Sequence, residues 1–211
     1  MNFLKARPMK IHQMPQRSDD WFAVRVGKIT ATSFATMANG RDATIETLCL
    51  KTAAEIITGQ AGEKLYINAA MQHGIDTEEQ AKAAYSIANL CHVQEVGFIE
   101  LNEYIGCSPD GLIDDDGGLE IKCPETHTHL TYLNEKGNAW KAYKWQVQGA
   151  LWITGREYWD FVSFCPAFSK RRLLIERVLP DLKCFEMLQA GSEFCINRIK
   201  KIIEVYHDNI A

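Results

Sequence analysis

Residues 108–122 read Ser-Pro-Asp-Gly-Leu-Ile-Asp-Asp-Asp-Gly-Gly-Leu-Glu-Ile-Lys, and this stretch predicts a β-hairpin. Residues 107–113 are typical of a bend that leads into a short strand. Leu119–Cys123 is typical of a second strand, which Pro124 ends. Between them, Asp114–Gly118 is rich in Asp and Gly, which tolerate the positive φ of hairpin turns. We therefore expect two short antiparallel strands joined by a tight turn.

The second strand places two charged side chains on one face. Side chains alternate along a strand, so Glu120 and Lys122 share a face while the apolar residues between them point the other way. If the two strands pair, Asp110 lies close to Glu120. The hairpin then gathers two carboxylates and one ammonium into one patch.

Such a patch indicates metal-dependent chemistry. Two neighbouring carboxylates repel each other and need a cation. Oxygen ligands favour Mg²⁺ or Mn²⁺, and Mg²⁺ binds through one or two carboxylates together with water and phosphate. Lys122 can orient or activate a water for phosphodiester hydrolysis. The alternative is an exposed hairpin whose Glu–Lys pair contributes about 0–1 kcal/mol.

Length and composition favour one globular domain. The chain has 211 residues, with 46% hydrophobic and 24% charged residues, which are ordinary values for a packed domain. The first residues lack the apolar core of a signal peptide, and no run approaches the ~20 apolar residues that a membrane span needs. Seven scattered cysteines without a Cys-x-x-Cys pair predict reduced thiols and a cytoplasmic location.

Charge is distributed unevenly, although the net charge is −4. Met1–Lys28 has six bases and two acids, and Thr131–Arg172 has seven bases and three acids. Between them, Asp76–Glu120 has eleven acids and one base. An acidic centre between basic segments suits a metal site with phosphate-binding walls, although chance segregation on a solvated surface is common.

A long helix, expected to start near Ile67, supplies a third carboxylate. Its apolar stripe contains Ala81, Ala84, Tyr85 and Ala88, at i, i+3, i+4 and i+7. Extended backwards, the stripe reaches Glu78 and leaves Glu79 outside. A buried acid needs a partner or a metal, so Glu78 is the candidate ligand.

A second predicted helix, in Ala142–Trp152, turns an amide inward. Tyr143, Gln146, Ala150 and Ile153 share one side of it. A buried amide needs hydrogen-bond partners, which a scissile phosphate or an attacking water can supply. The alternative is a glutamine satisfied within the core.

The N-terminal region predicts an anion pocket. A short helix capped by Ser18 ends at Arg25, and Gly27 follows it. A second helix then opens after the hydroxyl-bearing residues Thr30, Thr32 and Ser33. Helix starts bind phosphate readily, and Arg25 can complete the pocket. Ordinary helix capping is the alternative.

The remaining elements complete an α/β fold. Helix 45–58 precedes the long helix, Val93–Leu101 reads as a strand feeding the hairpin, and Glu157–Phe164 and Leu173–Val178 are further strands. Lys170–Arg172 lies in the loop between these two strands, as a DNA-backbone contact or a plain solvated turn. A helix from Asp181 to about His207, either continuous or broken at Gly191, closes the chain. We expect a central mixed β-sheet flanked by helices.

Five ordered motifs resemble the PD-(D/E)XK nucleases, and more narrowly the lambda-exonuclease branch of YqaJ-type viral recombinases. They are Trp21-x-x-x-Arg25-x-Gly27-x-Ile29-Thr30-Ala31, Glu78 on a helix, Ser108-Pro109-Asp110-Gly111, Glu120-Ile121-Lys122-Cys123-Pro124 and Tyr143-x-x-Gln146-Val147-Gln148. The resemblance covers roughly residues 18–165. Five motifs in order are far more specific than any one of them.

The resemblance implies a fold and an activity. The fold is a single α/β domain with a restriction-endonuclease-like PD-(D/E)XK core over residues 1–211, of which 181–211 is a C-terminal helical segment. The activity is Mg²⁺-dependent 5′→3′ digestion of one strand of linear double-stranded DNA, leaving 3′ single-stranded tails for recombination; Mn²⁺ can substitute. The implied assembly is a homotrimeric ring that binds double-stranded DNA ends, with a single-strand annealing recombinase protein as partner, in the bacterial host cytoplasm.

The resemblance also implies roles for individual residues. Glu78, Asp110, Glu120 and the backbone carbonyl of Ile121 would hold the metal. Lys122 would position the water, and Gln146 would touch the reacting end. The contacts to DNA and its 5′-phosphate would fall on Arg25, Thr30, Thr32, Ser33, Ser108 and Tyr143.

Three other functions remain open at this stage. A PD-(D/E)XK endonuclease would use the same chemistry without needing a DNA end. A non-catalytic module could bind DNA ends with the same fold. A structural zinc protein would have to use Cys91, His92, Cys107, Cys123, His127 and His129, whose spacing is wider than that of usual zinc sites.

Overall fold

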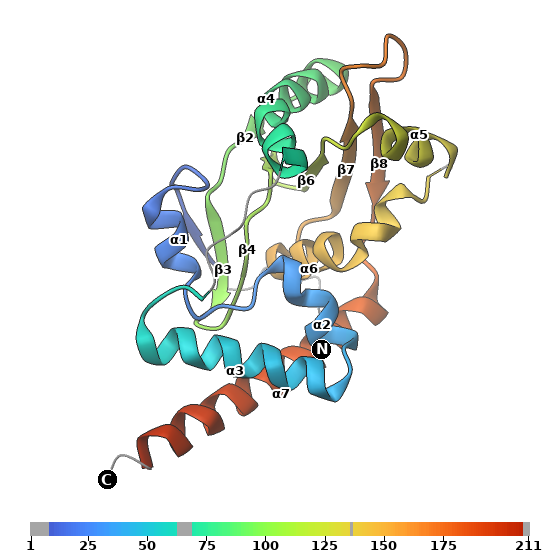
Figure 1. The fold of residues 1–211 in the computed structure, drawn as a ribbon. Helices are drawn as coiled ribbons and strands as arrows, with labels where there is room; N and C mark the ends of the chain where they lie inside the picture. Colours follow the sequence, from blue (N-terminus) through green and yellow to red (C-terminus); the bar gives the residue numbers. More distant parts are fainter. Residues whose placement is uncertain (1–8, 63–68, 136, 209–211) are drawn as a thin grey trace.

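The predicted hairpin lies in the middle of a five-stranded sheet (Figure 1). In the computed structural model, which describes residues 9–62, 69–135 and 137–208, the strand order is β2-β5-β6-β7-β8. The strands are β2 Val93–Gln94, β5 Gly111–Ile113, β6 Gly117–Lys122, β7 Tyr158–Phe164 and β8 Leu173–Val178. β6 and β7 run parallel and the other neighbours antiparallel. The predicted mixed sheet is confirmed.

The hairpin turn is shorter than predicted. Only Asp114–Asp116 form it, while Gly117 and Gly118 belong to β6. A Cβ on Gly118 would lie 2.1 Å from a ring atom of Trp159 on the neighbouring strand. This glycine therefore serves the close packing of β6 against β7, and its assignment to the turn is wrong.

The expected strand Val93–Leu101 is two strands in two different sheets. β2 pairs with β5, whereas β3 (Phe98–Asn102) belongs to a three-stranded sheet with order β1-β3-β4. The flanking strands are β1 (Lys10–His12) and β4 (Ile105–Cys107). Gly97 allows the change of sheet, because a Cβ there would lie 2.4 Å from a backbone oxygen of Met14.

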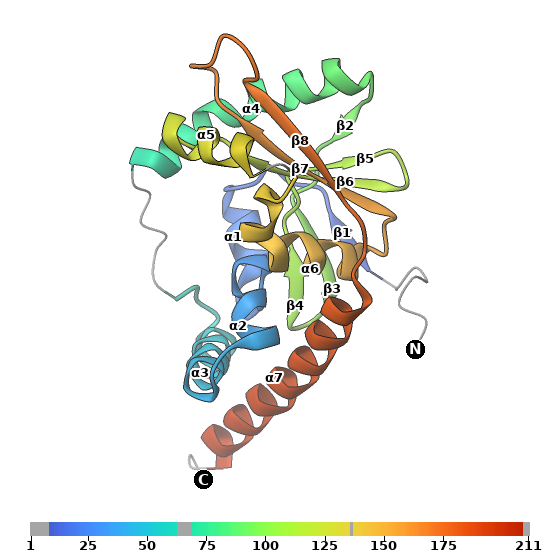
Figure 2. The same cartoon turned by 90° about the vertical axis from the view of Figure 1, so that its right-hand side faces the viewer.

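Helices cover both faces of the large sheet. They are α1 Asp19–Arg25, α2 Phe34–Asn39, α3 Asp42–Thr58, α4 Ala69–Asn89, α5 Thr126–Asn134, α6 Lys144–Thr154 and α7 Leu182–Asp208, with 3₁₀ turns at Ala31–Ser33 and Ala139–Tyr143. α4 packs on β6, β7 and β8 over one apolar cluster, and α6 packs on β6 and β7 within another. Figure 2 shows α6 in the middle of the molecule, between the sheets and α7. The expected start of α4 near Ile67 lies outside the described residues.

The helix α5 was not predicted. It follows β6 closely and packs on β7, burying His129, Tyr132 and Leu133. Its sequence, Thr-His-Thr-His-Leu-Thr-Tyr-Leu-Asn, carries few apolar residues, and Leu130 among them is half exposed. The apolar periodicity is therefore too weak to indicate a helix.

The helix α7 is continuous, so of the two forms that the sequence allowed, the unbroken helix is correct. A Cβ at Gly191 would lie 2.1 Å from the carbonyl oxygen of Met37 in α2. Glycine is needed here because two helix backbones approach closely, not because the helix ends. In the part of the chain that the structure describes, no helix is long and apolar enough to cross a membrane.

Candidate active site

The hairpin brings Asp110, Glu120 and Lys122 together, as predicted. The Nζ atom of Lys122 donates to Glu120 Oε1 at 2.5 Å. Asp110 precedes β5, and its Oδ2 accepts a hydrogen bond from the backbone N–H of Ile121 at 2.6 Å. Because Ile121 stands between Glu120 and Lys122 in β6, this bond fixes the Asp110 carboxylate beside the other two groups.

Burial and mutual charge control the ionisation of this patch. Burial and then the neighbouring Glu120 raise the pKa of Asp110 to about 8, against the opposing effect of Lys122. Burial disfavours the ammonium of Lys122, but Glu120 and Asp110 outweigh it and raise its pKa. Lys122 also lies 4.9 Å from the ring centroid of Tyr143. The ammonium stays charged, whereas Asp110 keeps its proton up to about pH 8 unless a further cation favours the carboxylate.

Glu78 faces the site, as the helical periodicity predicted. Its side chain is 15% exposed, against 74% for Glu79. Its carboxylate pairs with Arg17 at 3.1 Å and with Lys82 at 3.3 Å. The charge of Glu78 also contributes to the raised pKa of Asp110, so the third acid lies within electrostatic reach of the hairpin.

The chemistry of these donors fits a hard divalent cation, although they do not form a ready-made cage. Among the described residues, no three His, Cys, Asp or Glu side chains converge closely enough to hold a metal ion. Each acid instead has a partner within the protein: Glu78 binds Arg17, Glu120 binds Lys122, and Asp110 accepts an N–H. Carboxylate oxygens with unbalanced charge are nevertheless the ligands that Mg²⁺ prefers.

Gln146 keeps an acceptor without a partner. Its Oε1 is buried and makes no hydrogen bond within the described part of the chain. Gln148 is instead the satisfied core glutamine, donating to Leu179 O and accepting from Asp181 N, both at 2.9 Å. Gln146 lies one turn after Tyr143, whose ring contacts Lys122. An unsatisfied buried acceptor here requires a donor from outside the protein.

The predicted anion pocket forms around Arg25. Its guanidinium stacks 4.1 Å from the Trp21 ring and donates to Ser108 Oγ at 3.1 Å and to Thr30 Oγ1 at 3.4 Å. Burial lowers its pKa, and it forms no ion pair with any acid in the described residues. Since Ser108 stands two residues before Asp110, this unpaired cation lies next to the carboxylate patch.

The hydroxyl residues of the pocket are not equally placed. Thr30 is buried and lies 3.5 Å from Thr32 through their hydroxyl oxygens. Thr32 is exposed, and Ser33 is half-buried at the end of a 3₁₀ turn. Thr30 and Ser108 thus belong to the Arg25 network, while the roles predicted for Thr32 and Ser33 stay predictions.

Two cations at the site, Lys82 and Arg17, were not predicted. Lys82 stands four residues after Glu78 on the same helix, a spacing that was available as a signal. Arg17 is 61 residues from Glu78 along the chain, has a φ of +67° and reaches Glu78 from the loop before α1. No local pattern indicates such a contact.

The zinc alternative finds no support in the described residues. No group of three or more His, Cys, Asp or Glu side chains there could hold a metal ion. Both ring nitrogens of His129 are engaged, with Ser163 Oγ at 2.8 Å and Arg171 O at 2.9 Å.

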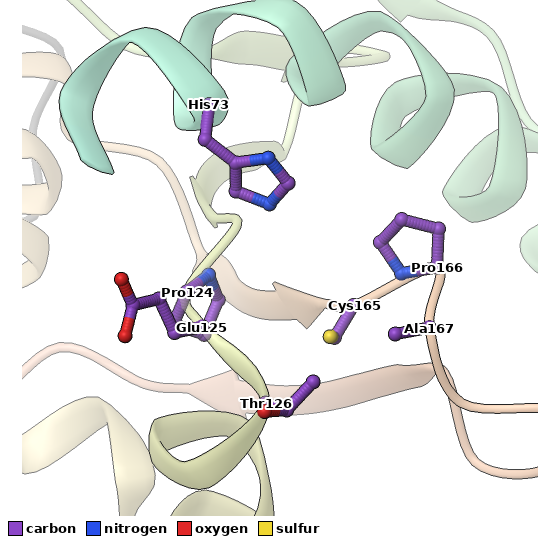
Figure 3. A pocket seen from close by; sticks show the side chains of 7 residues that line it. All are labelled: His73, Pro124, Glu125, Thr126, Cys165, Pro166 and Ala167. Atoms are coloured by element: carbon purple, nitrogen blue, oxygen red, sulfur yellow. The ribbon is translucent and has the colours of Figure 1, made fainter. Parts of the chain in front are cut away.

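A pocket of about 380 Å³ adjoins the hairpin (Figure 3). It is lined by His73, Pro124, Glu125, Thr126, Cys165, Pro166 and Ala167. Figure 3 shows His73 reaching from α4 toward the segment that follows β6. The pocket therefore lies just beyond Lys122, at the carboxyl ends of the parallel strands β6 and β7. It contains none of the predicted site residues.

Residues 20–157 match the YqaJ-like viral recombinase domain. The chain belongs to this family. A comparison of the chain with curated protein sequences found no match. The predicted membership is confirmed, and with it the predicted class of enzyme, a nuclease.

Comparison with solved structures agrees with membership of the YqaJ-like family. The chain is similar to the alkaline exonuclease LHK-Exo from Laribacter hongkongensis, with 31% identity, a TM-score of 0.82, and coverage of 92% of this chain and 98% of that chain. The complex of LHK-Exo with dAMP gives 30% identity and the same TM-score and coverage. A phage-related exonuclease from Haemophilus somnus 129PT shares the fold, at 14% identity, a TM-score of 0.66, and coverage of 85% and 96%.

Proposed function

We propose that this nuclease is a Mg²⁺-dependent exonuclease that digests one strand of linear double-stranded DNA in the 5′→3′ direction and leaves 3′ single-stranded tails. The observation that carries the proposal is the continuity of two sites. The unpaired guanidinium of Arg25 bonds Ser108, and two residues later Asp110 begins the carboxylate patch. A terminal 5′-phosphate bound at Arg25 would hold the neighbouring phosphodiester near Glu120 and Lys122. The similarity to LHK-Exo, an alkaline exonuclease whose structure is also known in complex with dAMP, supports an exonuclease activity.

Each residue of the patch has a distinct role in the proposed reaction. Glu78, Asp110, Glu120 and the carbonyl of Ile121 would hold Mg²⁺, which when bound polarises the phosphate and stabilises the leaving oxygen. Lys122 orients the attacking water, because its ammonium is anchored on Glu120. The orphaned Oε1 of Gln146 accepts a hydrogen bond from the water or the reacting end.

An end-dependence assay tests the proposal. Linear duplex labelled at the 5′ or 3′ end and closed-circular duplex are incubated with Mg²⁺, with Mn²⁺ and with EDTA. We expect mononucleotides from linear DNA, loss of the 5′ label first, an intact circle and no reaction in EDTA. Lys122→Ala should reduce the rate at least about 10²-fold while the protein remains folded. Cleavage of the circle would instead favour an endonuclease, and binding without nucleotide release would favour an end-binding module.

We also propose a homotrimeric ring that acts with a single-strand annealing recombinase. The family resemblance and the segregation of basic and acidic segments support this assembly, because a ring can enclose a basic channel behind an acidic exterior. Light scattering coupled to size-exclusion chromatography should give about three times the chain mass of 23.9 kDa. A monomeric mass under conditions of full activity would contradict it.

A further inference from the structure

The loop between β7 and β8 carries three consecutive cations that the proposed catalytic reaction does not use. Lys170, Arg171 and Arg172 are all exposed. None of them takes part in an ion pair with an acid in the described part of the chain. Adjacent like charges repel each other, and on a solvated surface acidic residues usually lie among the basic ones. A run of unpaired cations is typical of a surface that meets a polyanion.

The backbone of this loop is fixed. Cys165 N donates to Arg172 O at 2.8 Å, and Phe168 N donates to Cys165 O at 3.2 Å, which closes the loop at its base. Arg171 has a φ of +58°, a conformation that non-glycine residues adopt rarely. A backbone kept in such a conformation must be held by its surroundings.

A buried histidine holds Arg171 in place. His129 of α5 is fully buried, and its Nε2 lies 2.9 Å from the carbonyl oxygen of Arg171. Because a carbonyl only accepts, Nε2 donates, and Nδ1 pairs with the Ser163 hydroxyl at 2.8 Å. The ring also meets Phe168 edge-on, with centroids 5.1 Å apart. The cations are thus presented on a rigid support.

This support stands on the face of the sheet that carries the catalytic lysine. Ser163 is the register partner of Lys122, so the two side chains lie next to each other on one face. On the next strand, β8, the register partner of Ser163 is Leu174, and Arg172 stands two residues before Leu174. Arg172 is therefore two strands across the sheet and two residues along from Lys122. At about 4.8 Å per strand and about 3.3 Å per residue, its Cα lies about 12 Å from that of Lys122. The pocket of Figure 3 lies between the end of β6 and this loop, because Pro124 and the first loop residues, Cys165 and Pro166, line it.

We propose that Lys170–Arg172 is a second nucleic-acid contact, which binds backbone phosphates about three or four nucleotide steps from the reacting bond. The inference rests on the proposed function and adds to it a grip on the DNA that is separate from the 5′-phosphate pocket at Arg25. The contact reads charge and not sequence, because exposed cations bind backbone phosphates, which carry no sequence information.

Salt-dependent binding in EDTA tests the proposal without cleavage. The test variant is Lys170→Ala, Arg171→Gly, Arg172→Ala, in which glycine keeps the positive φ while the charge is lost. The matched control is Lys51→Ala, Lys183→Ala, Lys201→Ala, which removes three exposed cations of α3 and α7. Fluorescence anisotropy with a 5′-phosphorylated duplex and with a single strand gives the affinity at several salt concentrations.

We expect the test variant to bind about 10–100-fold more weakly at low salt, with a log–log salt slope reduced by about 2–3 on duplex or about 2 on single strand. The control variant should match the wild type. Loss confined to the duplex assigns the loop to the undigested DNA ahead of the site, and loss confined to the single strand assigns it to the 3′ single-stranded tail. Equal slopes for the test variant, control and wild type on both DNAs would overturn the proposal. Absence of DNA binding by the wild-type protein would instead overturn the proposed function.

Discussion

At the scale of single residues, Asp110 couples stability to pH. Its pKa is about 8 in the folded protein, because of burial and Glu120, and about 3.9 in an unfolded chain. A group with a raised folded pKa stabilises the fold fully below its unfolded pKa, and this contribution is lost as pH rises through the folded pKa. Without metal, stability should therefore fall between about pH 4 and 8, by up to about 1.4 kcal/mol per pH unit.

Asp110→Asn isolates this effect. The amide cannot titrate, so in EDTA the free energy of unfolding of the variant should depend less on pH than that of wild type. Between pH 5 and pH 8 the variant should therefore become more stable relative to wild type. Urea denaturation at each pH measures the difference. If the acids bind Mg²⁺, added Mg²⁺ should raise the stability of wild type more at pH 8 than at pH 5. Parallel pH profiles for the two proteins would contradict the assignment.

Arg25 should determine the preference for a phosphorylated end. It forms no ion pair among the described residues and its hydrogen bonds go to hydroxyls, so a bound phosphate would be the first anion in direct contact with it. Loss of such a charged hydrogen bond costs about 1.5–3 kcal/mol, or about 10–100-fold. Arg25→Ala should slow digestion of 5′-phosphorylated duplex by that factor and of 5′-hydroxyl duplex by about threefold or less. Initial rates on the two substrates measure it, and equal losses would refute the role.

Local periodicity explains which site residues could be predicted. Glu78 was distinguished from Glu79 because helix spacing alone decides which of the two lies on the apolar stripe. Asp110 and Glu120 followed from strand alternation across one hairpin. Arg17 could not be predicted, because its contact with Glu78 depends on tertiary structure. The choice between Gln146 and Gln148 as the satisfied amide also depends on distant partners, Leu179 and Asp181.

At the scale of elements, one hydrogen bond joins α4 to the sheet. The hydroxyl of Tyr85 donates to the buried carboxylate of Asp160 at 2.6 Å, and Arg177 holds the same carboxylate through two bonds of 2.8 Å. Burial and Asp160 raise the pKa of Tyr85, so the hydroxyl keeps its proton. Tyr85 stands seven residues after Glu78 on the same side of α4, so this bond helps to set where Glu78 lies.

Tyr85→Phe should therefore destabilise the protein by about 1–3 kcal/mol. It should also weaken the Mg²⁺-dependent stabilisation, because Glu78 is placed less firmly. Tyr158→Phe is the matched control. The Tyr158 ring stacks on Arg177, and loss of the Tyr158 hydroxyl breaks no hydrogen bond described in the structure. Urea denaturation with and without Mg²⁺ compares the two. A loss of stability in Tyr158→Phe equal to that in Tyr85→Phe would contradict the role of the bond.

Elements with clear periodicity were predicted well, and those defined by their neighbours were not. The strand Leu173–Val178 was predicted with its observed bounds, because branched and aliphatic residues fill it. The division of Val93–Leu101 into β2 and β3 depends on Gly97 passing the Met14 backbone, which no local pattern indicates. The helix α5 is held by buried His129 and by packing on β7 more than by an apolar stripe.

At the scale of the whole molecule, α7 completes the core although it lies outside the region that matches the family. The match ends at residue 157, yet Phe185, Leu188, Cys195 and Ile199 are fully buried in the main apolar cluster. α7 packs on α2, α3 and α6, and Arg198 pairs with Glu46 of α3. The segment that contains α2 and α3 therefore packs against the C-terminal helix, a contact between distant parts of the chain that no local pattern indicates.

Alanine substitutions at two helical glycines, Gly74 and Gly191, should change the stability of the protein in opposite directions. Alanine favours a helix over glycine by about 1 kcal/mol. Among the residues that the structure describes, a Cβ at Gly74 of α4 meets nothing within 4 Å, so Gly74→Ala should stabilise the protein by about that amount. A Cβ at Gly191 would lie 2.1 Å from a backbone oxygen of α2, which cannot move away cheaply. Overpacking of this kind costs about 1–3 kcal/mol or more and outweighs the helical gain.

Gly191→Ala should therefore lower the free energy of unfolding while Gly74→Ala raises it, in urea denaturation under the same conditions. Because α2 follows directly on the segment that carries Thr30, displacement of α2 should also reduce the selectivity for 5′-phosphorylated ends in Gly191→Ala. Gly74→Ala should keep that selectivity. Stabilisation by both substitutions would mean that α7 and α2 do not approach as closely as described, and that the C-terminal helix does not hold the phosphate pocket in place.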